Sequence, residues 1–111
     1  MIYTSVTIFG LTAIIGMYLL TLVLRRKGIP KAATVIHGLF AVAALALLVI
    51  YSAGNASGPL ASIIIFVIAA MLGFVLNYRD LTGKKIPKWL AVSHGLIALA
   101  GFMILLVFAF R

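Results

Sequence analysis

Four long apolar runs constrain the fold of this chain more than any other feature. They cover residues 2–24, 30–51, 60–77 and 87–110. A helix needs about 20 apolar residues to cross the hydrocarbon core of a bilayer, and each run is close to that length. The chain is 66% hydrophobic over its 111 residues, which argues against an ordinary soluble domain. We therefore expect an all-α integral membrane protein surrounded by the lipid bilayer.

The segments between the runs predict the topology. One basic cluster follows the first run and another follows the third; they are Arg25, Arg26, Lys27 and Lys31, then Arg79, Lys84, Lys85 and Lys88. Loops rich in Lys and Arg stay in the cytoplasm, so residues 78–85 are expected to be a cytoplasmic loop. Residues 52–59 are small and uncharged, as in an outer turn. We predict an up-down-up-down four-helix transmembrane bundle in a bacterial inner membrane, with the N and C termini, including Arg111, in the periplasm.

The charge balance fits this topology. The chain has nine Lys and Arg residues and one acid, Asp80, for a net charge of +8. Such an excess can indicate nucleic-acid binding, but here it is confined to the ends of apolar runs, so we expect no nucleic-acid partner. The chain has no cysteine, which excludes disulfides and thiolate metal sites. No positive residue precedes the first run, so we expect a retained span rather than a cleaved signal peptide.

An eleven-residue segment occurs twice. Residues 29–39 and 86–96 share Ile-Pro-Lys at their start and His-Gly-Leu at their end, at an offset of 57 residues. Identities continue at this offset without gaps, including Ser5 with Ser62, Phe9 with Phe66, Gly16 with Gly73 and Ala41 with Ala98. We interpret the single domain, residues 1–111, as a duplicated helical hairpin with repeats 5–54 and 62–111. Two copies in the same orientation place a pseudo-twofold axis along the membrane normal.

Both histidines of the chain, His37 and His94, lie inside this repeat. Each follows a helix-opening proline by seven residues, which places it about 10 Å into its helix. An ionisable side chain inside a span is costly and indicates function. Two imidazoles that face each other across a bundle suit the two axial positions of one haem iron. We therefore predict one non-covalent haem b per chain with these histidines as metal ligands, since thioether attachment requires cysteine.

Other residues complete the predicted site. Ala41 and Ala98 lie one turn beyond the histidines and leave space for a macrocycle. Gly16 and Gly73 lie at a similar depth and would let the porphyrin edge approach the backbone. Lys31 and Lys88 are expected to pair with the propionates, besides setting topology. Two simpler interpretations remain: the histidines make interhelical hydrogen bonds of about 1 kcal/mol, and the glycines only pack helices.

The His37-Gly38 and His94-Gly95 pairs, together with Gly16, Gly73 and four spans, resemble membrane b-type cytochromes, which bind haem between histidines of a four-helix bundle. The resemblance implies electron transfer within the membrane, with a quinone or a membrane redox protein as partner. Activity as a haem-dependent oxidoreductase toward quinol or a reactive oxygen species stays open. Many such cytochromes hold two haems with four histidines, whereas this chain has ligands for one.

Three other functions are compatible with parts of the sequence. The length and the four spans resemble small multidrug exporters. Those exporters depend on a carboxylate in the first span, but the first span here has none, and the one acid, Asp80, is expected in a loop. Two histidines underfill a tetrahedral site for copper, zinc or nickel, and a homodimer would supply four only if both pairs met at one interface. A structural or assembly subunit without a cofactor is also compatible with the sequence.

Overall fold

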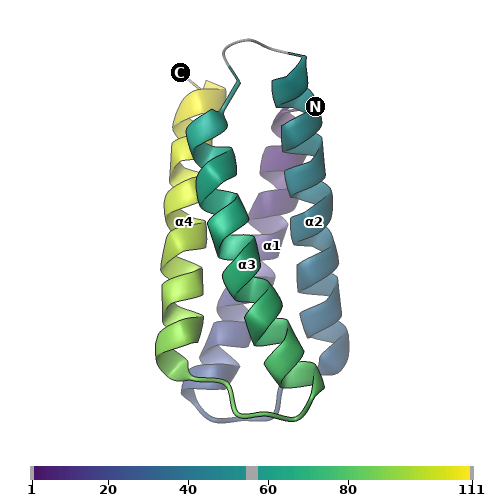
Figure 1. The fold of residues 1–111 in the computed structure, drawn as a ribbon, viewed down its shortest axis with the longest axis vertical. Coiled ribbons are helices and arrows are strands. Elements are labelled where there is room, and N and C mark those ends of the chain that lie inside the picture. Colours follow the sequence, from purple (N-terminus) through teal and green to yellow (C-terminus); the bar gives the residue numbers. More distant parts are fainter. Residues whose placement is uncertain (1, 55–57, 111) are drawn as a thin grey trace.

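A computed structural model describes residues 2–54 and 58–110. These residues form four α-helices (Figure 1), namely α1 (Ile2–Leu24), α2 (Lys31–Ala53), α3 (Leu60–Leu81) and α4 (Lys88–Phe110). All four are long and apolar enough to cross a membrane, which confirms the prediction of an all-α chain with four membrane-length helices. The middle of the expected outer turn, residues 55–57, and the expected position of Arg111 lie outside the described residues.

The helices pack side by side in a four-membered bundle. Helix α1 contacts α2 and α4, and α3 contacts the same two helices, so α2 and α4 lie diagonally across the bundle. The connections between α1 and α2 and between α3 and α4 lie at one end, here called the basic end (Figure 1). The bundle extends 43 Å along its long axis. A helix of 23 residues is about 34 Å long, enough for a hydrocarbon core of about 30 Å.

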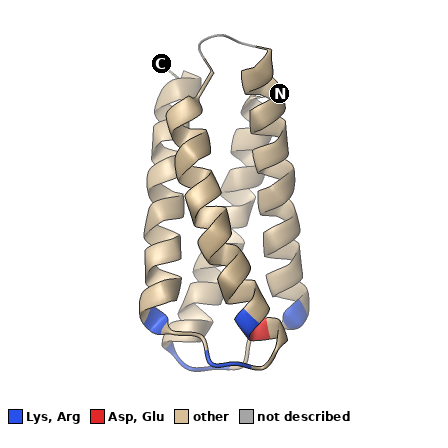
Figure 2. Cartoon of the chain, viewed as in Figure 1, with Lys and Arg blue, Asp and Glu red and all other residues tan. Residues whose placement is uncertain are grey.

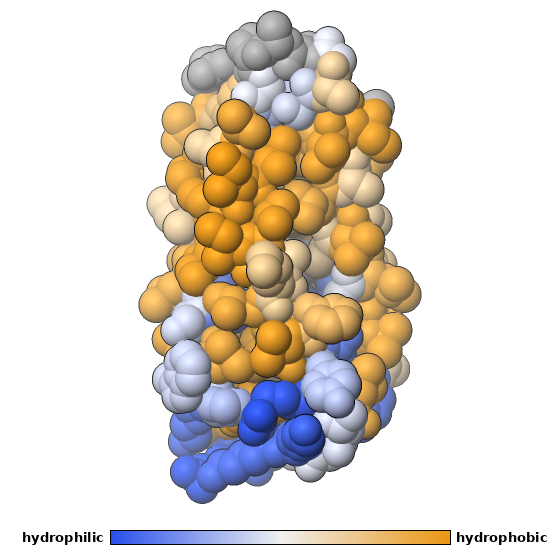
Figure 3. Space-filling view, viewed as in Figure 1, coloured by the Kyte–Doolittle hydropathy of each residue, from blue (hydrophilic) through white to orange (hydrophobic). Residues whose placement is uncertain are grey.

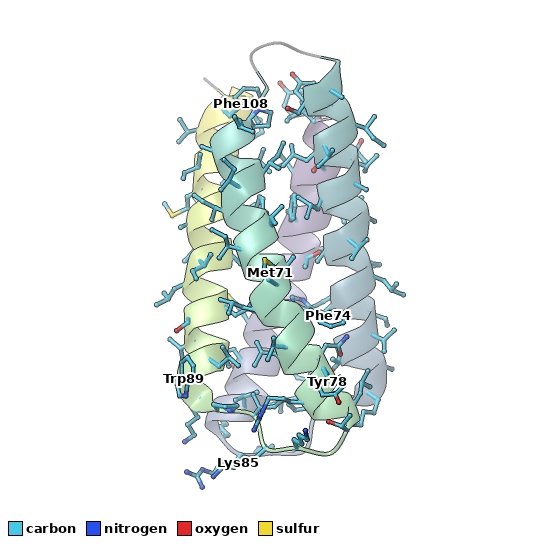
Figure 4. The ribbon with its side chains drawn as sticks, viewed as in Figure 1. Met71, Phe74, Tyr78, Lys85, Trp89 and Phe108 are labelled. Carbon is cyan, nitrogen blue, oxygen red and sulfur yellow. The ribbon has the colours of Figure 1, made fainter. Side chains whose placement is uncertain are left out.

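The outer surface is apolar except at its ends. Figure 2 shows the Lys and Arg residues of the described chain gathered at the basic end, and Figure 3 shows a broad hydrophobic belt above them. Large apolar side chains such as Met71 and Phe74 point away from the bundle (Figure 4), with exposed fractions of 65% and 74%. An apolar surface of this extent is unusual for a soluble monomer and suits contact with lipid.

The helix ends of the two halves correspond. Helices α1 and α3 end at Leu24 and Leu81, and α2 and α4 begin at Lys31 and Lys88, each pair 57 residues apart. The prediction of a loop over residues 78–85 is therefore wrong for its first four residues, which form the last turn of α3. The polar residues 77–80 resemble a loop in sequence, but they remain helical because the chain beyond them supplies backbone donors that close the turn.

The same backbone turn ends α1 and α3. The N–H of Lys27 donates to the carbonyl of Leu22 at 2.9 Å, and the N–H of Lys84 donates to that of Arg79 at 2.8 Å. The residue before each donor has a left-handed backbone, with φ of 55° at Arg26 and 75° at Gly83. This is a Schellman ending, in which glycine is favoured because it has no Cβ. The first hairpin makes the same turn with Arg26 in place of a glycine, so a residue with a Cβ adopts the strained left-handed backbone conformation.

A packed core fills the half of the bundle farther from the basic end. The rings of Phe9 and Phe66 stack with centroids 4.0 Å apart and planes 6° from parallel. Beyond them the fully buried Ala44, Leu48 and Leu105 fill the interior. The interior nearer the basic end contains the two histidines and a cavity.

Candidate functional site

His37 on α2 and His94 on α4 lie opposite each other across the bundle. Their ring centroids are 6.2 Å apart and their planes are nearly perpendicular, at 81°. Both line one cavity of about 370 Å³, which is within the range of small-molecule and cofactor sites in proteins. The stacked Phe9 and Phe66 line the cavity as well. The structure therefore brings the two predicted ligands to one interior space.

A backbone carbonyl of a neighbouring helix holds each imidazole. Nδ1 of His37 lies 3.0 Å from the carbonyl oxygen of Thr12 on α1. Nδ1 of His94 lies 2.8 Å from the carbonyl oxygen of Ala69 on α3. Because a carbonyl oxygen can only accept, Nδ1 must carry the hydrogen. In a neutral imidazole the lone pair is then on Nε2, which leaves that atom able to bind a metal.

Gly16 and Gly73 make this arrangement possible. A Cβ atom at Gly16 would lie 2.9 Å from Cε1 of His37, and a Cβ atom at Gly73 would lie 2.9 Å from Cε1 of His94. Each glycine is one helical turn after the residue whose carbonyl binds the imidazole, so the two positions share a helix face. A side chain there would push the imidazole away from its carbonyl. The expected contact of these glycines was a porphyrin edge, whereas in the structure the contact is the imidazole itself.

The other predicted residues divide into two groups. Ala41 and Ala98 line the histidine cavity. Lys31 and Lys88 instead line a separate hollow at the basic end. Nζ of Lys31 lies 3.6 Å from Oδ1 of Asp80 and also donates to the backbone carbonyl of Asp80. The structure therefore does not place these two lysines in the lining of the cavity, and one of them has an acidic partner.

One wall of the cavity is polar, a feature that sequence reasoning missed. It contains Asn77 and Asp80 of α3 and Thr34 of α2, and the hydroxyl of Thr34 donates to Oδ2 of Asp80 at 3.3 Å. The prediction that Asp80 lies in a loop is wrong, because the last turn of α3 includes it. The carbonyl Oδ1 of Asn77 is buried without a hydrogen-bond partner among the described residues. The equivalent positions of the other half are apolar: Leu20, Val23 and Ala91. This local departure from the repeat is the sequence signal that could have revealed the polar wall.

The donor set limits the chemistry of the site. Over residues 2–54 and 58–110, no group of three or more His, Cys, Asp or Glu side chains is gathered to hold a metal ion. Two imidazoles suit a metal whose other ligands come from elsewhere, as the four ring nitrogens of a porphyrin do. Comparisons with known protein families, with curated protein sequences and with solved structures find no match.

Proposed function

We propose that this chain is an integral membrane b-type cytochrome that binds one haem b, without covalent attachment, between His37 and His94. The distance between the two rings carries the proposal. Imidazole–metal bonds are about 2 Å long and the ring centre lies about 1 Å behind the nitrogen, so two imidazoles on opposite sides of one metal ion have centres about 6 Å apart. The observed separation is 6.2 Å.

The surroundings of the histidines support this choice of ligand. The carbonyls of Thr12 and Ala69 fix the orientation of the imidazoles, and such hydrogen bonds raise the basicity of a metal-bound imidazole. Aromatic and small residues of the lining, among them Phe9, Phe66 and Ala98, suit a flat apolar guest. When bound, haem with two imidazole ligands supplies a six-coordinate iron that favours electron transfer over oxygen binding.

The orientation in the membrane is part of the proposal. The shared helix boundaries of the two halves support an up-down-up-down bundle built from two duplicated hairpins. The cluster of cations at one end supports cytoplasmic placement of the basic connections, with both termini in the periplasm of a bacterium. The histidines lie near this basic end, so a quinone or a membrane redox protein would exchange electrons with the haem on the cytoplasmic side.

Absorption spectroscopy tests the proposal. Protein purified in detergent from cells supplied with haem should show a Soret band and, after reduction, a sharp α-band. His37→Ala and His94→Ala should each abolish the low-spin spectrum. Met71→Ala is the matched control, because it removes a side chain that could ligate iron but points away from the bundle (Figure 4), and it should keep the spectrum. A colourless wild-type preparation, or a low-spin spectrum that survives loss of both histidines, would contradict the proposal.

A further inference from the structure

We propose that the basic end of the bundle holds a second binding site, for a ligand that carries several phosphate groups. A hollow of about 760 Å³ lies between the two short connections and the ends of the helices. Its lining contains seven cationic side chains and a single carboxylate, that of Asp80. The hollow shares Asp80 with the histidine cavity, but its ligand chemistry is different, and the proposal does not depend on haem.

The positive charge of the hollow is largely unopposed. Asp80 is already engaged by Lys31, at 3.6 Å. This leaves cations from both connections facing one space, with Arg26 and Lys27 on the first and Lys84 and Lys85 on the second. Like charges that line one hollow repel one another. A ligand with several negative charges would offset that repulsion and would form charge-assisted hydrogen bonds, which are about twice as strong as neutral ones.

The N-termini of two helices lie beside the hollow. Helices α2 and α4 both begin at the basic end, and their first intrahelical donors are the N–H groups of Thr34 and Ala91. The N–H groups of the three residues before each donor have no intrahelical acceptor. The first residues of these helices, Lys31 and Lys88, line the hollow. Free N–H groups at a helix start bind phosphate favourably, and here two parallel helices supply them beside the cations.

The C-terminal ends of α1 and α3 do not cancel the positive potential of the hollow. The C-terminal carbonyls of α1 and α3 would otherwise face the same end with partial negative charge. In both helices, however, backbone N–H groups of the connection cap them, including those of Lys27 and Lys84. The cationic side chains of the hollow and the free N–H groups at the starts of α2 and α4 suit phosphate oxygens.

Two sources of phosphate can reach this hollow: the headgroup of an anionic phospholipid and a free polyphosphate. Trp89, the single tryptophan of the chain, lines the hollow and is 71% exposed. Figure 4 shows it at the start of α4, at the basic end. Its fluorescence is therefore a direct probe of occupancy from either source.

The experiment follows Trp89 fluorescence in the full-length protein. One arm titrates detergent-solubilised protein with inorganic triphosphate, and the other compares nanodiscs of phosphatidylglycerol with nanodiscs of phosphatidylcholine. A saturable change in the first arm assigns a soluble ligand, and a change specific to phosphatidylglycerol assigns a lipid headgroup. Either result supports the site. The absence of a change in both arms overturns it.

Charge variants separate a site from general attraction. Lys27→Gln and Lys85→Gln each remove one cation from the lining and should weaken binding about tenfold, the effect of losing one charge-assisted hydrogen bond. Arg25→Gln is the matched control, because Arg25 is exposed at the same end but does not line the hollow. It should leave affinity within about twofold. Equal weakening by all three variants would show only diffuse attraction and would overturn the proposal. His37→Ala should leave this binding unchanged even where it abolishes haem binding, which keeps the two proposals distinguishable.

Discussion

The imidazole of His37 lies against the bare backbone of Gly16, so closely that a methyl group at the glycine would be 2.9 Å from Cε1 of the ring. The position of the ring, and with it the hydrogen bond from Nδ1 to Thr12, depends on the absence of a side chain on α1. The same relationship recurs between His94 and Gly73. The orientation of each proposed iron ligand is thus controlled by a residue on the neighbouring helix.

The first prediction concerns these glycines. Gly16→Ala should move the His37 ring off the Thr12 carbonyl and weaken haem retention by about 10- to 100-fold, as loss of a hydrogen bond behind a metal ligand does. Retention is measured by haem transfer to apomyoglobin. Gly10→Ala is the control on the same helix, since its new Cβ would lie 3.8 Å from the Phe102 ring, an ordinary contact. Equal retention in Gly16→Ala and wild type would count against the proposed role of the glycine.

The second prediction concerns the end of α1. Arg26 has a φ of 55° where its counterpart Gly83 has 75°. Replacing Arg26 by Gly should raise the free energy of unfolding by about 1 kcal/mol, because a non-glycine residue is strained in this region. Gly83→Ala should lower it by a similar amount. Thermal unfolding in detergent measures both changes. Arg25→Gly is the control, because it removes the neighbouring arginine from a position that does not have a positive φ. It should not raise the free energy of unfolding; if it does, the loss of charge rather than the relief of backbone strain explains the effect.

The third prediction compares two buried serines at equivalent positions. The hydroxyl of Ser5 donates to the carbonyl of Ala44 at 2.8 Å, whereas that of Ser62 has no hydrogen-bond partner among the described residues. Ser5→Ala should therefore destabilise the bundle by about 1 kcal/mol, and Ser62→Ala should stabilise it by about 1 kcal/mol, because a buried polar group without a partner is costly. Unfolding in detergent with increasing dodecyl sulfate measures the difference. Equal losses in the two variants would contradict the asymmetry.

The fourth prediction concerns the stacked aromatic pair. Phe66→Ala removes a buried ring that is 6% exposed and stacks on Phe9, so it should lower the free energy of unfolding by about 3–5 kcal/mol. Phe74→Ala on the same helix removes a ring that is 74% exposed and should change it by about 0.5 kcal/mol or less. Unfolding curves of the two variants test this contrast. Similar losses would mean that contact with surrounding molecules, rather than internal packing, dominates the stability of α3.

The sequence predicted the helices well because a membrane span requires one long apolar segment. It failed at the end of α3, where polar residues over 77–80 resemble a loop yet complete the last helical turn. The repeat itself carried the missing information, since α1 ends at Leu24 and the equivalent residue is Leu81. Internal comparison of the two halves would have placed this boundary better than local polarity did.

The candidate site was predictable only in part. The common offset of the two histidines and two glycines indicated that they act together, and the structure places each His beside a Gly. The carbonyl partners of the imidazoles could not be predicted, because every residue has a carbonyl and only helix packing selects one. Local polarity did not reveal the polar wall, since Asn77 and Asp80 have polar neighbours in sequence and reach the cavity only because α3 continues past residue 77; the departure from the repeat at these positions is the one signal for it.

The place of the histidines on the basic side of the stacked Phe9 and Phe66 has a consequence for how the proposed cytochrome would respond to membrane voltage. The two rings line the cavity together with His37 and His94, the two histidines of the chain, and the packed core lies beyond them, away from the basic end. A haem held by these histidines would lie nearer the basic end, so an electron exchanged with that end would cross only part of the electric field. Moving one charge through the full field costs about 2.3 kcal/mol per 100 mV, so electron exchange with the basic end would depend on the membrane potential by only part of that amount. A complete transmembrane circuit would require another carrier on the far side of the aromatic pair.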